Sequence, residues 1–520
     1  MADLNITVAA TVPPPAKPVA VGSPPRLGIW LIAAGAFLLE LAVSGRYGYV
    51  RDELYFLAAG KHLAFGYVDQ PALTPLIARM SAALTGNTLV GLRLIPALGL
   101  AALVVITAAI SRLLGAGRTG QLLAALAAAT CAEFIGAMHE LTTTTPDFVF
   151  WAITLLLVTR LLVSQDPRWW MAVGGCAGLA ADAKWNIAFL IGSLVPGFLM
   201  TDARRLLRSR YVVAGALLAA VLAVPDVAWQ AVHGWPNLAV FRALQAQAWH
   251  NRATYWPAQV LFTGIALTPL WIAGLVWALR SARGRAFRPV AIGCALAVAL
   301  QFVLGGKPYY PGGAFTFLLA AGCVPAERRL AARAERLIAA GRAVRVRPAA
   351  LAAGAMLVAG AAALPIALPV LPASALRTVP LQKINYDLAE SIGWPRQVAL
   401  VAREYHALSP GLRGHTTVLA GNYGEAGAID RYGAGYGLPQ VFSGANTFWL
   451  WGPPPASATA AIAVNVDPAL LRREFTRVRL VAVFRNGIGV ADDEQGARIY
   501  LAVGLRTSWS RAWPAFRDYS

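Results

Sequence analysis

Residues 27–56 read LGIWLIAAGAFLLELAVSGRYGYVRDELYF, an apolar run followed at once by a short polar segment with two adjacent carboxylates. The run from Leu27 to Val43 approaches the roughly 20 residues that cross a bilayer as a helix. No basic region opens the chain ahead of this run, and further apolar runs follow it. We therefore interpret it as an uncleaved first transmembrane helix and not as a signal peptide.

The composition of the whole chain indicates the same environment. Hydrophobic residues make up 58% of the 520 residues, charged residues only 13%, and the mean hydropathy is +0.56. A soluble protein of this length needs more charge to cover its surface, so the sequence predicts an integral membrane protein. Residues 1–26, rich in Pro, Ala and Val, are predicted to be a disordered N-terminal tail.

The apolar runs divide the chain into a transmembrane domain, residues 27–372, and a C-terminal domain, residues 373–520. The first domain is predicted to be all-α with about 11 transmembrane helices, near residues 27–44, 90–111, 119–138, 147–164, 169–183, 185–200, 211–229, 257–279, 289–305, 311–324 and 349–371. The second has short β-type runs separated by turn residues, which predicts a small mixed α/β domain. The strand candidates are 416–420, 461–466 and 478–484.

The formal net charge of +20 comes largely from arginine clusters between apolar runs, at 204–210, 280–288 and 328–347. Such clusters are typical of cytoplasmic loops under the positive-inside rule. The 328–347 cluster has no interleaved aromatic residues, which disfavours a nucleic-acid partner. With the N-terminus inside, the first loop, residues 45–89, and the C-terminal domain are expected on the extracytoplasmic side of the membrane.

The first loop carries the clearest functional signal. If residues 52–62 are helical, Asp52, Tyr55 and His62 share one face, and an apolar face opposite them fits a helix lying along the membrane. Asp69 is expected to cap a second helix. A carboxylate there could accept a proton from an attacking hydroxyl, and Glu53 could support it.

Other polar residues are expected to face the same side. Arg93, Lys184 and Lys307 could neutralise a phosphate leaving group, as a metal ion could. Asp147 follows Thr145, a candidate helix cap, and lies near His139 and Glu140 in the sequence. The sequence leaves open whether a divalent cation, Mg²⁺ or Mn²⁺, takes part.

Five short motifs run from the first loop to the C-terminal domain. They are Arg51-Asp-Glu-Leu-Tyr, Gly66-Tyr-Val-Asp-Gln-Pro-Ala-Leu, Thr145-Pro-Asp, Lys307-Pro-Tyr-Tyr-Pro and Tyr423-Gly-Glu-Ala-Gly-Ala. In this combination, which is more specific than any one motif, the chain resembles GT-C fold glycosyltransferases of family 39, which include protein O-mannosyltransferases and the lipid A aminoarabinose transferase.

The resemblance implies inverting transfer of a sugar from a polyprenyl-phosphate donor to an envelope glycan, lipid or protein acceptor. It implies Asp52 as the base with Glu53 in support, and Asp147 as a second carboxylate that orients the acceptor or an ion. Donor-phosphate contacts are implied for Lys307, Lys184, Arg93, Tyr309 and Tyr310, and acceptor or loop roles for Asp69, Tyr55, His139 and Glu140.

Two other classes of protein stay open. A lipid or sugar transporter, or a flippase, would also be polytopic, but it should carry ionisable groups near the midplane of the membrane and often internal repeats. A non-catalytic subunit of an envelope complex would tolerate loss of Asp52, whereas an enzyme would not.

Overall fold

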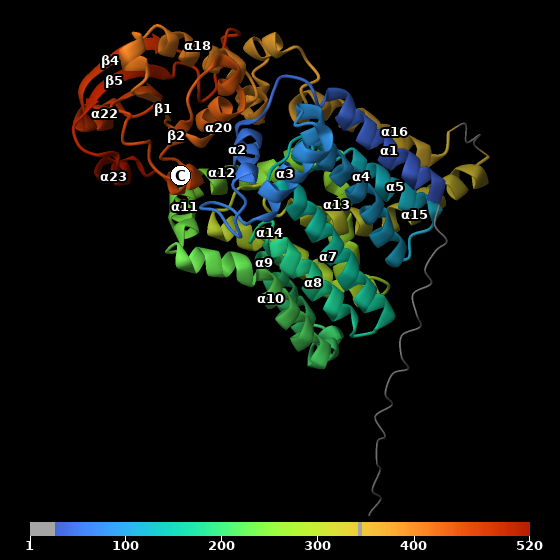
Figure 1. Cartoon of the computed structure of the whole chain (residues 1–520). Helices are drawn as coiled ribbons and strands as arrows, with labels where there is room; N and C mark the ends of the chain where they lie inside the picture. The colour runs from blue at the N-terminus through green and yellow to red at the C-terminus, as the bar shows by residue number, and fades with distance from the viewer. Residues whose placement is uncertain (1–25, 342–345, 520) are drawn as a thin grey trace, which may run out of the picture.

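The structure is a computed structural model, and it describes residues 26–341 and 346–519. The predicted N-terminal tail therefore lies outside the described residues, except for Arg26, which begins the first helix. A large helical part is followed by a compact C-terminal part that contains the sheet and lies at one end of the helices (Figure 1). This confirms the predicted fold class.

The helical part is built from long apolar helices and short connecting ones. In order they are α1 (Arg26–Val43), α4 (Leu89–Leu113), α5 (Arg118–Ala129), α6 (Ala132–Ala137), α7 (Thr144–Ser164), α8 (Trp169–Ala181), α9 (Ile187–Leu199), α10 (Arg210–Val232), α11 (Pro236–Gln245), α12 (Ala248–Thr263), α13 (Thr268–Arg280), α14 (Arg288–Leu304), α15 (Phe315–Ala339) and α16 (Pro348–Ala367). Two helices of the first loop, α2 (Arg51–Lys61) and α3 (Leu73–Thr85), lie between α1 and α4 in the chain.

Five helices of the described part are long and apolar enough to cross a membrane, or up to seven if each of two bent helix pairs forms one span. Helices α1 and α8 are apolar but shorter. The chain is thus a membrane-spanning protein, and the count of about 11 spans stays a prediction.

Three predicted helices differ from those observed. The segment 119–138 is divided at Cys131 into α5 and α6, and 257–279 is divided into α12 and α13, which are bent by 101°. The second break follows Gly264, whose φ of +96° favours glycine, and a proline in the first turn starts α13. Helix α15 continues to Ala339, well beyond the predicted end at residue 324.

The C-terminal part holds a five-stranded sheet in the order β2-β1-β3-β5-β4. The strands are β1 (Thr416–Ala420), β2 (Val441–Ser443), β3 (Ala460–Val464), β4 (Phe475–Val483) and β5 (Arg498–Leu505). Strand β1 pairs in parallel with β2 and β3, whereas β5 runs antiparallel to β3 and β4. Strands β2 and β5 have no counterpart among the predicted runs.

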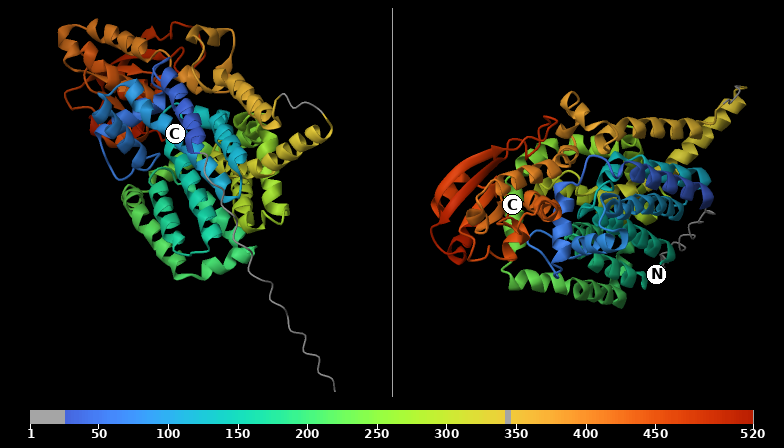
Figure 2. Two further views of the ribbon diagram at one scale, coloured as in Figure 1. Left: turned by 90° about the vertical axis from the view of Figure 1, so that its right-hand side faces the viewer. Right: turned by 45° about the horizontal axis from the view of Figure 1, so that its top comes forward.

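Alternate residues of the central strands pack on opposite faces of the sheet. Val418 and Ile462 face a core shared with α18 (Trp394–His406) and α20 (Tyr423–Tyr432), and that core also contains the apolar residues of α2. Leu419 and Ala461 face a second core closed by α22 (Pro468–Glu474) and α23 (Trp509–Ala512). Helix α2 thus lies against the C-terminal domain, as both views in Figure 2 show.

Candidate active site

The first-loop helix α2 is held against α20 of the C-terminal domain by close helix packing. Gly427 permits this approach, since a Cβ at that position would stand 2.8 Å from the backbone carbonyl carbon of Leu54. The apolar face of α2, including Leu54 and Leu57, is buried in the domain core. The expectation of a helix whose apolar face rests on the membrane is therefore wrong, because the C-terminal domain covers that face.

Asp52 lies in the first turn of α2 and is half-buried. Its Oδ1 accepts a hydrogen bond of 3.0 Å from the hydroxyl of Tyr423, at the start of α20. The guanidinium of the preceding Arg51 lies 5.6 Å from the Tyr423 ring and 5.9 Å from the Tyr386 ring. The C-terminal domain thus supplies the group that orients the Asp52 carboxylate.

Glu53 is fully buried and bound by a buried arginine. Its carboxylate accepts hydrogen bonds from Arg93 Nε at 3.0 Å and Arg93 Nη2 at 2.9 Å. It also accepts from the backbone N–H groups of Val50 at 3.0 Å and Leu141 at 3.2 Å. The same guanidinium donates to the carbonyls of Ser44 and Gly48.

These contacts bear on two predicted roles. Arg93 is only 2% exposed and its donors are engaged by the protein, so the geometry favours a structural role over contact with a donor phosphate. Glu53 supports the site by joining α2, α4 and the segment before α7. Neither catalysis by Glu53 nor phosphate binding by Arg93 is tested by these contacts, and both stay predictions.

Asp69 and Tyr55 form one hydrogen-bonded unit beside Asp52. The Tyr55 hydroxyl lies 2.7 Å from Asp69 Oδ1 and 2.8 Å from the Thr447 hydroxyl of the C-terminal domain. Burial raises the pKa of Asp69 to about 7, although the Tyr55 hydrogen bond opposes the rise. The predicted helix-capping role is wrong, because α3 begins at Leu73 and Ala72 is its N-cap.

His139 and Glu140 precede α7 and have different surroundings. His139 Nδ1 lies 3.1 Å from Glu40 of α1, and Arg93 Nη1 lies 3.2 Å from His139 Nε2. Burial and the neighbouring arginine hold the pKa of His139 well below its usual range, so the ring is neutral. His139 therefore belongs to the buried network around Arg93.

Glu140 instead belongs to a carboxyl pair with Asp387, which opens α17 (Asp387–Glu390). Burial, and then the charge of Asp387, raise the pKa of Glu140 well above its usual range. Burial also raises the pKa of Asp387 to about 6, with a further contribution from Asp52, while a hydrogen bond from Glu140 opposes the rise. Glu140 and Asp387 therefore form a buried, hydrogen-bonded carboxyl pair that joins the segment before α7 to the C-terminal domain.

Two lysines converge on the loop between α14 and α15. The ammonium of Lys184 lies 4.5 Å from the ring centre of Tyr310 and 5.5 Å from that of Tyr309, and Lys307 lies 5.9 Å from the Tyr309 ring. Burial lowers the pKa of Lys184 to about 8, and Lys307 contributes in the same direction, whereas Asp147 opposes the shift. Both ammonium groups therefore lie close to the ring of Tyr309.

The pKa of Tyr309 is itself raised, first by burial and then by the charges of Asp387 and Asp52. Glu140 and Asp147 act on it in the same direction. Tyr309 thus lies within electrostatic range of carboxylates from the first loop, from α7 and from the C-terminal domain. Tyr309 is therefore close to both predicted lysines and within electrostatic range of the predicted carboxylates Asp52, Glu140 and Asp147.

Asp147 is completely buried in the first part of α7. Its Oδ2 accepts a hydrogen bond of 2.8 Å from Asn186, whose amide also donates to the Tyr310 carbonyl at 2.8 Å. Lys184 donates to Thr144 in the same turn of α7 at 3.2 Å. The helix starts at Thr144 with Thr143 as N-cap, so the predicted cap at Thr145 is wrong by two residues.

Sequence reasoning did not identify Tyr423, Asp387 or Asn186 as members of this site. Tyr423 opens a motif that carried the resemblance, so that motif was an available signal. Asp387 lies in a segment without any motif, and Asn186 adjoins the predicted Lys184. Only the folded chain brings them to Asp52, Glu140 and Asp147.

Within residues 26–341 and 346–519, no group of three or more His, Cys, Asp or Glu side chains is arranged to hold a metal ion. Carboxylates do meet here in pairs, and such ligands suit Mg²⁺ or Mn²⁺ when phosphate oxygens complete the shell. The divalent cation stays a prediction.

Residues 69–229 match a protein-family model described as dolichyl-phosphate-mannose-protein mannosyltransferase. Two crystal structures of ArnT from Cupriavidus metallidurans resemble most of the chain. The structure bound to undecaprenyl phosphate has a TM-score of 0.52 and the apo structure 0.54, each at 16% identity, covering 91% of this chain and 97% of that chain. A comparison with curated proteins gives no match.

At this identity the structural likeness shows the fold, which is shared over nearly the full length of both chains. The family model adds a sequence match that begins at Asp69 and ends within α10. The predicted resemblance to GT-C glycosyltransferases is thereby confirmed, and the chain has the GT-C fold.

Proposed function

We propose that this chain is an integral-membrane glycosyltransferase that moves a sugar from a polyprenyl-phosphate donor to a hydroxyl acceptor with inversion at the anomeric carbon. The observation that carries the proposal is the arrangement around Tyr309, where the Lys184 and Lys307 ammonium groups lie 5.5 Å and 5.9 Å from the ring centre and the Asp52 and Asp387 carboxylates are within electrostatic range. The match to a mannosyltransferase family model and the ArnT structure bound to undecaprenyl phosphate support the donor class.

In the proposed reaction Asp52 accepts the proton of the acceptor hydroxyl as its oxygen forms a bond to the anomeric carbon. The bond from that carbon to the phosphate oxygen breaks, and its electron pair leaves with polyprenyl phosphate. The ammonium groups of Lys184 and Lys307 stabilise the charge that develops on this leaving group. Tyr423 holds the Asp52 carboxylate by its 3.0 Å hydrogen bond.

The remaining residues position these groups. Asp147 lies on the helix turn that contacts Lys184 and, through Asn186, fixes the backbone of the tyrosine loop at Tyr310. The Tyr55–Asp69 pair joins the first loop to the C-terminal domain beside Asp52 and is proposed to contact the acceptor.

The proposed location is the inner membrane of a bacterium, with Asp52 and the C-terminal domain on the periplasmic side. The arginine clusters would then lie in the cytoplasm, as the positive-inside rule requires. A donor with a long polyprenyl chain would enter the site sideways from the lipid. The acceptor is proposed to be an envelope glycan, lipid or protein.

The test uses purified protein in lipid with a panel of short-chain polyprenyl-phosphate sugars and, separately, nucleotide sugars. Release of free polyprenyl phosphate is followed for the wild type, for Asp52→Asn and for a control, Asp430→Asn. Asp430 lies on α20 and pairs with Lys61 at the surface, 2.7 Å away, outside the proposed chemistry. We expect release from one lipid donor in the wild type and the control, and none in Asp52→Asn.

The other outcomes would each contradict a different part of the proposal. Consumption of a nucleotide sugar would reject the lipid donor, and full turnover by Asp52→Asn would reject the base. No release from any lipid donor, with a panel of hydroxyl acceptors present, would favour the transporter or the non-catalytic subunit.

A further inference from the structure

A polar cluster joins the first loop to the C-terminal domain beside Asp52. In this cluster Asp69 Oδ1 accepts the 2.7 Å hydrogen bond from Tyr55, and Asp69 Oδ2 accepts a longer one of 3.4 Å from the side-chain amide of Asn446. Asn446 opens α21 (Asn446–Leu450), which follows β2 in the chain. The two oxygens of one carboxylate are thus bound by side chains from two distant segments.

The backbone fixes the position of the Asn446 amide. Its φ of +45° lies in the left-handed region, which asparagine tolerates better than most residues. The N–H of Asn446 donates to the Asp518 carbonyl at 2.8 Å, next to a β-bridge between Ala445 and Asp518. The segment near the C-terminus therefore holds Asn446 in the conformation that brings its amide to Asp69.

The protein satisfies the Asn446 amide only in part. The residue is 2% exposed, and no group within residues 26–341 and 346–519 donates to its Oδ1. Gln70, next to Asp69, is equally buried, and neither atom of its amide has a partner in the same part of the chain. Buried polar atoms without a hydrogen bond are uncommon in native proteins, and each calls for an explanation. A ligand rich in hydroxyl groups would provide one.

Asp52 is within electrostatic range of this cluster and of the lysine cluster. The pKa of Tyr423 is raised by burial, then by Asp52, and further by Asp69. Asp52 also acts on Tyr309, the ring beside the two lysines. In the proposed inverting transfer the phosphate leaves on the side of the lysines, and the acceptor approaches the opposite face of the sugar. The Asp69 cluster suits the acceptor, since among the described residues no Lys or Arg pairs with Asp69.

We propose that Asp69 and Asn446 bind hydroxyl groups of the acceptor other than the one that Asp52 deprotonates, and that the acceptor is therefore a sugar. Asn446 Oδ1 and Asp69 Oδ2 each accept a hydrogen bond from one of two adjacent ring hydroxyls. This inference rests on the proposed function, and it narrows the acceptor from an envelope glycan, lipid or protein to a glycan or the sugar of a glycolipid.

Other hydroxyl acceptors fit the cluster less well. A serine or threonine side chain, like a simple alcohol, has only the reacting hydroxyl and would leave Asn446 Oδ1 unpaired. An acceptor with a phosphate next to its hydroxyl would meet the charges of Asp52 and Asp69. A sugar brings several neutral hydroxyls, and a site built to bond a substrate hydroxyl rejects the analogue that lacks it.

The first measurement detects binding without transfer. The purified full-length chain in nanodiscs is mixed with millimolar methyl glycosides of glucose, galactose and mannose, and saturation transfer from protein to sugar is recorded by NMR. The wild type is compared with Asn446→Gly and with a matched control, Asn465→Gly. Asn465 is exposed and has a φ of +53°, so glycine adopts either conformation without strain. Only Asn446→Gly removes an amide that contacts Asp69.

Each variant is first checked for a single symmetric peak by size exclusion. We expect the wild type and the control to bind at least one glycoside, and Asn446→Gly to bind it roughly ten-fold or more weakly, because a buried hydrogen bond to the sugar is lost. Equal affinity in Asn446→Gly and the wild type would overturn the proposal. So would a wild type that binds none of the glycosides.

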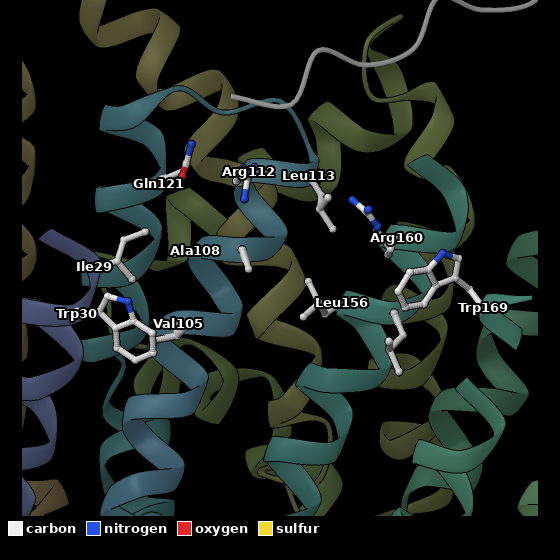
Figure 3. A pocket seen from close by; sticks show the side chains of 12 residues that line it. Ile29, Trp30, Val105, Ala108, Arg112, Leu113, Gln121, Leu156, Arg160 and Trp169 are labelled. Atoms are coloured by element: carbon white, nitrogen blue, oxygen red, sulfur yellow. The ribbon is translucent and has the colours of Figure 1, made fainter. Parts of the chain in front are cut away.

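A separate pocket, of about 370 Å³, lies among the helices of the transmembrane domain. Its lining residues belong to α1, α4, α5, α7 and α8, and Figure 3 shows Trp30, Val105 and Trp169 among them. Val105→Trp fills this pocket and should leave glycoside binding unchanged. If Val105→Trp weakened binding as much as Asn446→Gly does, the sugar would not be bound by the Asp69 cluster, and the proposal would be rejected.

The second measurement connects binding to transfer. Release of polyprenyl phosphate from the active lipid donor is compared for the bound glycoside and its monodeoxy analogues. In the wild type at least one missing hydroxyl should lower kcat/KM about ten-fold or more, and in Asn446→Gly this difference should disappear. A difference that persists in Asn446→Gly, or equal turnover with a serine peptide, would contradict the proposal. Glycoside binding that depends on Asn446 without any release would reject the proposed transfer and leave only a sugar-binding site.

Discussion

The buried pair of Glu53 and Arg93 allows structural and catalytic roles to be separated. Glu53→Gln keeps the shape of the side chain but removes the charge that faces a guanidinium only 2% exposed. Four hydrogen bonds end on this carboxylate, two from Arg93 and two from backbone N–H groups. The amide of glutamine accepts hydrogen bonds only with its one oxygen, and its NH₂ group would face the donors that the second carboxylate oxygen now binds.

The expected cost follows from this geometry. Loss of one partner of a buried ion pair destabilises a protein by about 3–5 kcal/mol, because the remaining charge stays buried without compensation. Arg93→Gln should cost a similar amount. The double variant should lose clearly less than the sum of the two single losses, since both remove one interaction.

Thermal unfolding of the purified protein in lipid measures this effect, with Asp52→Asn as the comparison. We expect Glu53→Gln to unfold at a markedly lower temperature and Asp52→Asn to unfold close to the wild type. If Glu53→Gln were as stable as the wild type and yet inactive, Glu53 would be a direct participant in catalysis and the structural reasoning would be refuted.

Three further outcomes are expected. Donor binding should need the protonated form of Lys184, whose pKa of about 8 would be lower without the charge of Asp147. In Asp147→Asn the residual turnover should therefore decline at a lower pH on the alkaline side than in the wild type. An alkaline decline at the same pH in both proteins would reject the coupling of Asp147 to Lys184. Gly427→Val should place a side chain against the backbone of α2, where a Cβ would stand 2.8 Å from the carbonyl carbon of Leu54. We expect the free energy of unfolding to fall by about 1–3 kcal/mol and turnover to decrease. Unchanged stability and turnover would contradict the tight packing of α2 on α20. The four native cysteines are buried, so an introduced cysteine at an exposed position should be the one that reacts with a maleimide. An impermeant maleimide applied to intact cells should label Ser457→Cys, on the proposed periplasmic side, but not Ala282→Cys, on the proposed cytoplasmic side. The reverse pattern would contradict the proposed topology.

The sequence was sufficient for those features that depend on local pattern. Apolar length predicted the helices, and the first-loop carboxylates and the outer lysines were identified from their position at span ends. The run 416–420 forms β1 with the predicted bounds. These features need only a periodicity, a run length or a neighbouring charge.

What the sequence could not supply depends on contacts between distant segments. Tyr423 donates to Asp52 across 371 positions, and Tyr55 contacts Thr447 across 392. Hydropathy gave α2 an apolar face, but a membrane and a protein core are equally apolar, so the pattern could not say which one covers it. Arg93 looked like a free cation at a helix end until the fold placed Glu53 against it.

The dependence of Asp52 on α20 has a consequence for how the protein is made. The first loop leaves the ribosome hundreds of residues before Tyr423 and Thr447. Helix α2 therefore lacks its contacts with the C-terminal domain while the intervening helices are inserted into the membrane. Translation that stops early would leave a polytopic membrane protein whose first loop lacks the Tyr423 and Thr447 contacts. A chain that ends before α20 would therefore present an unassembled site, and the proposed transfer could begin only after Tyr423 and Thr447 have been synthesised.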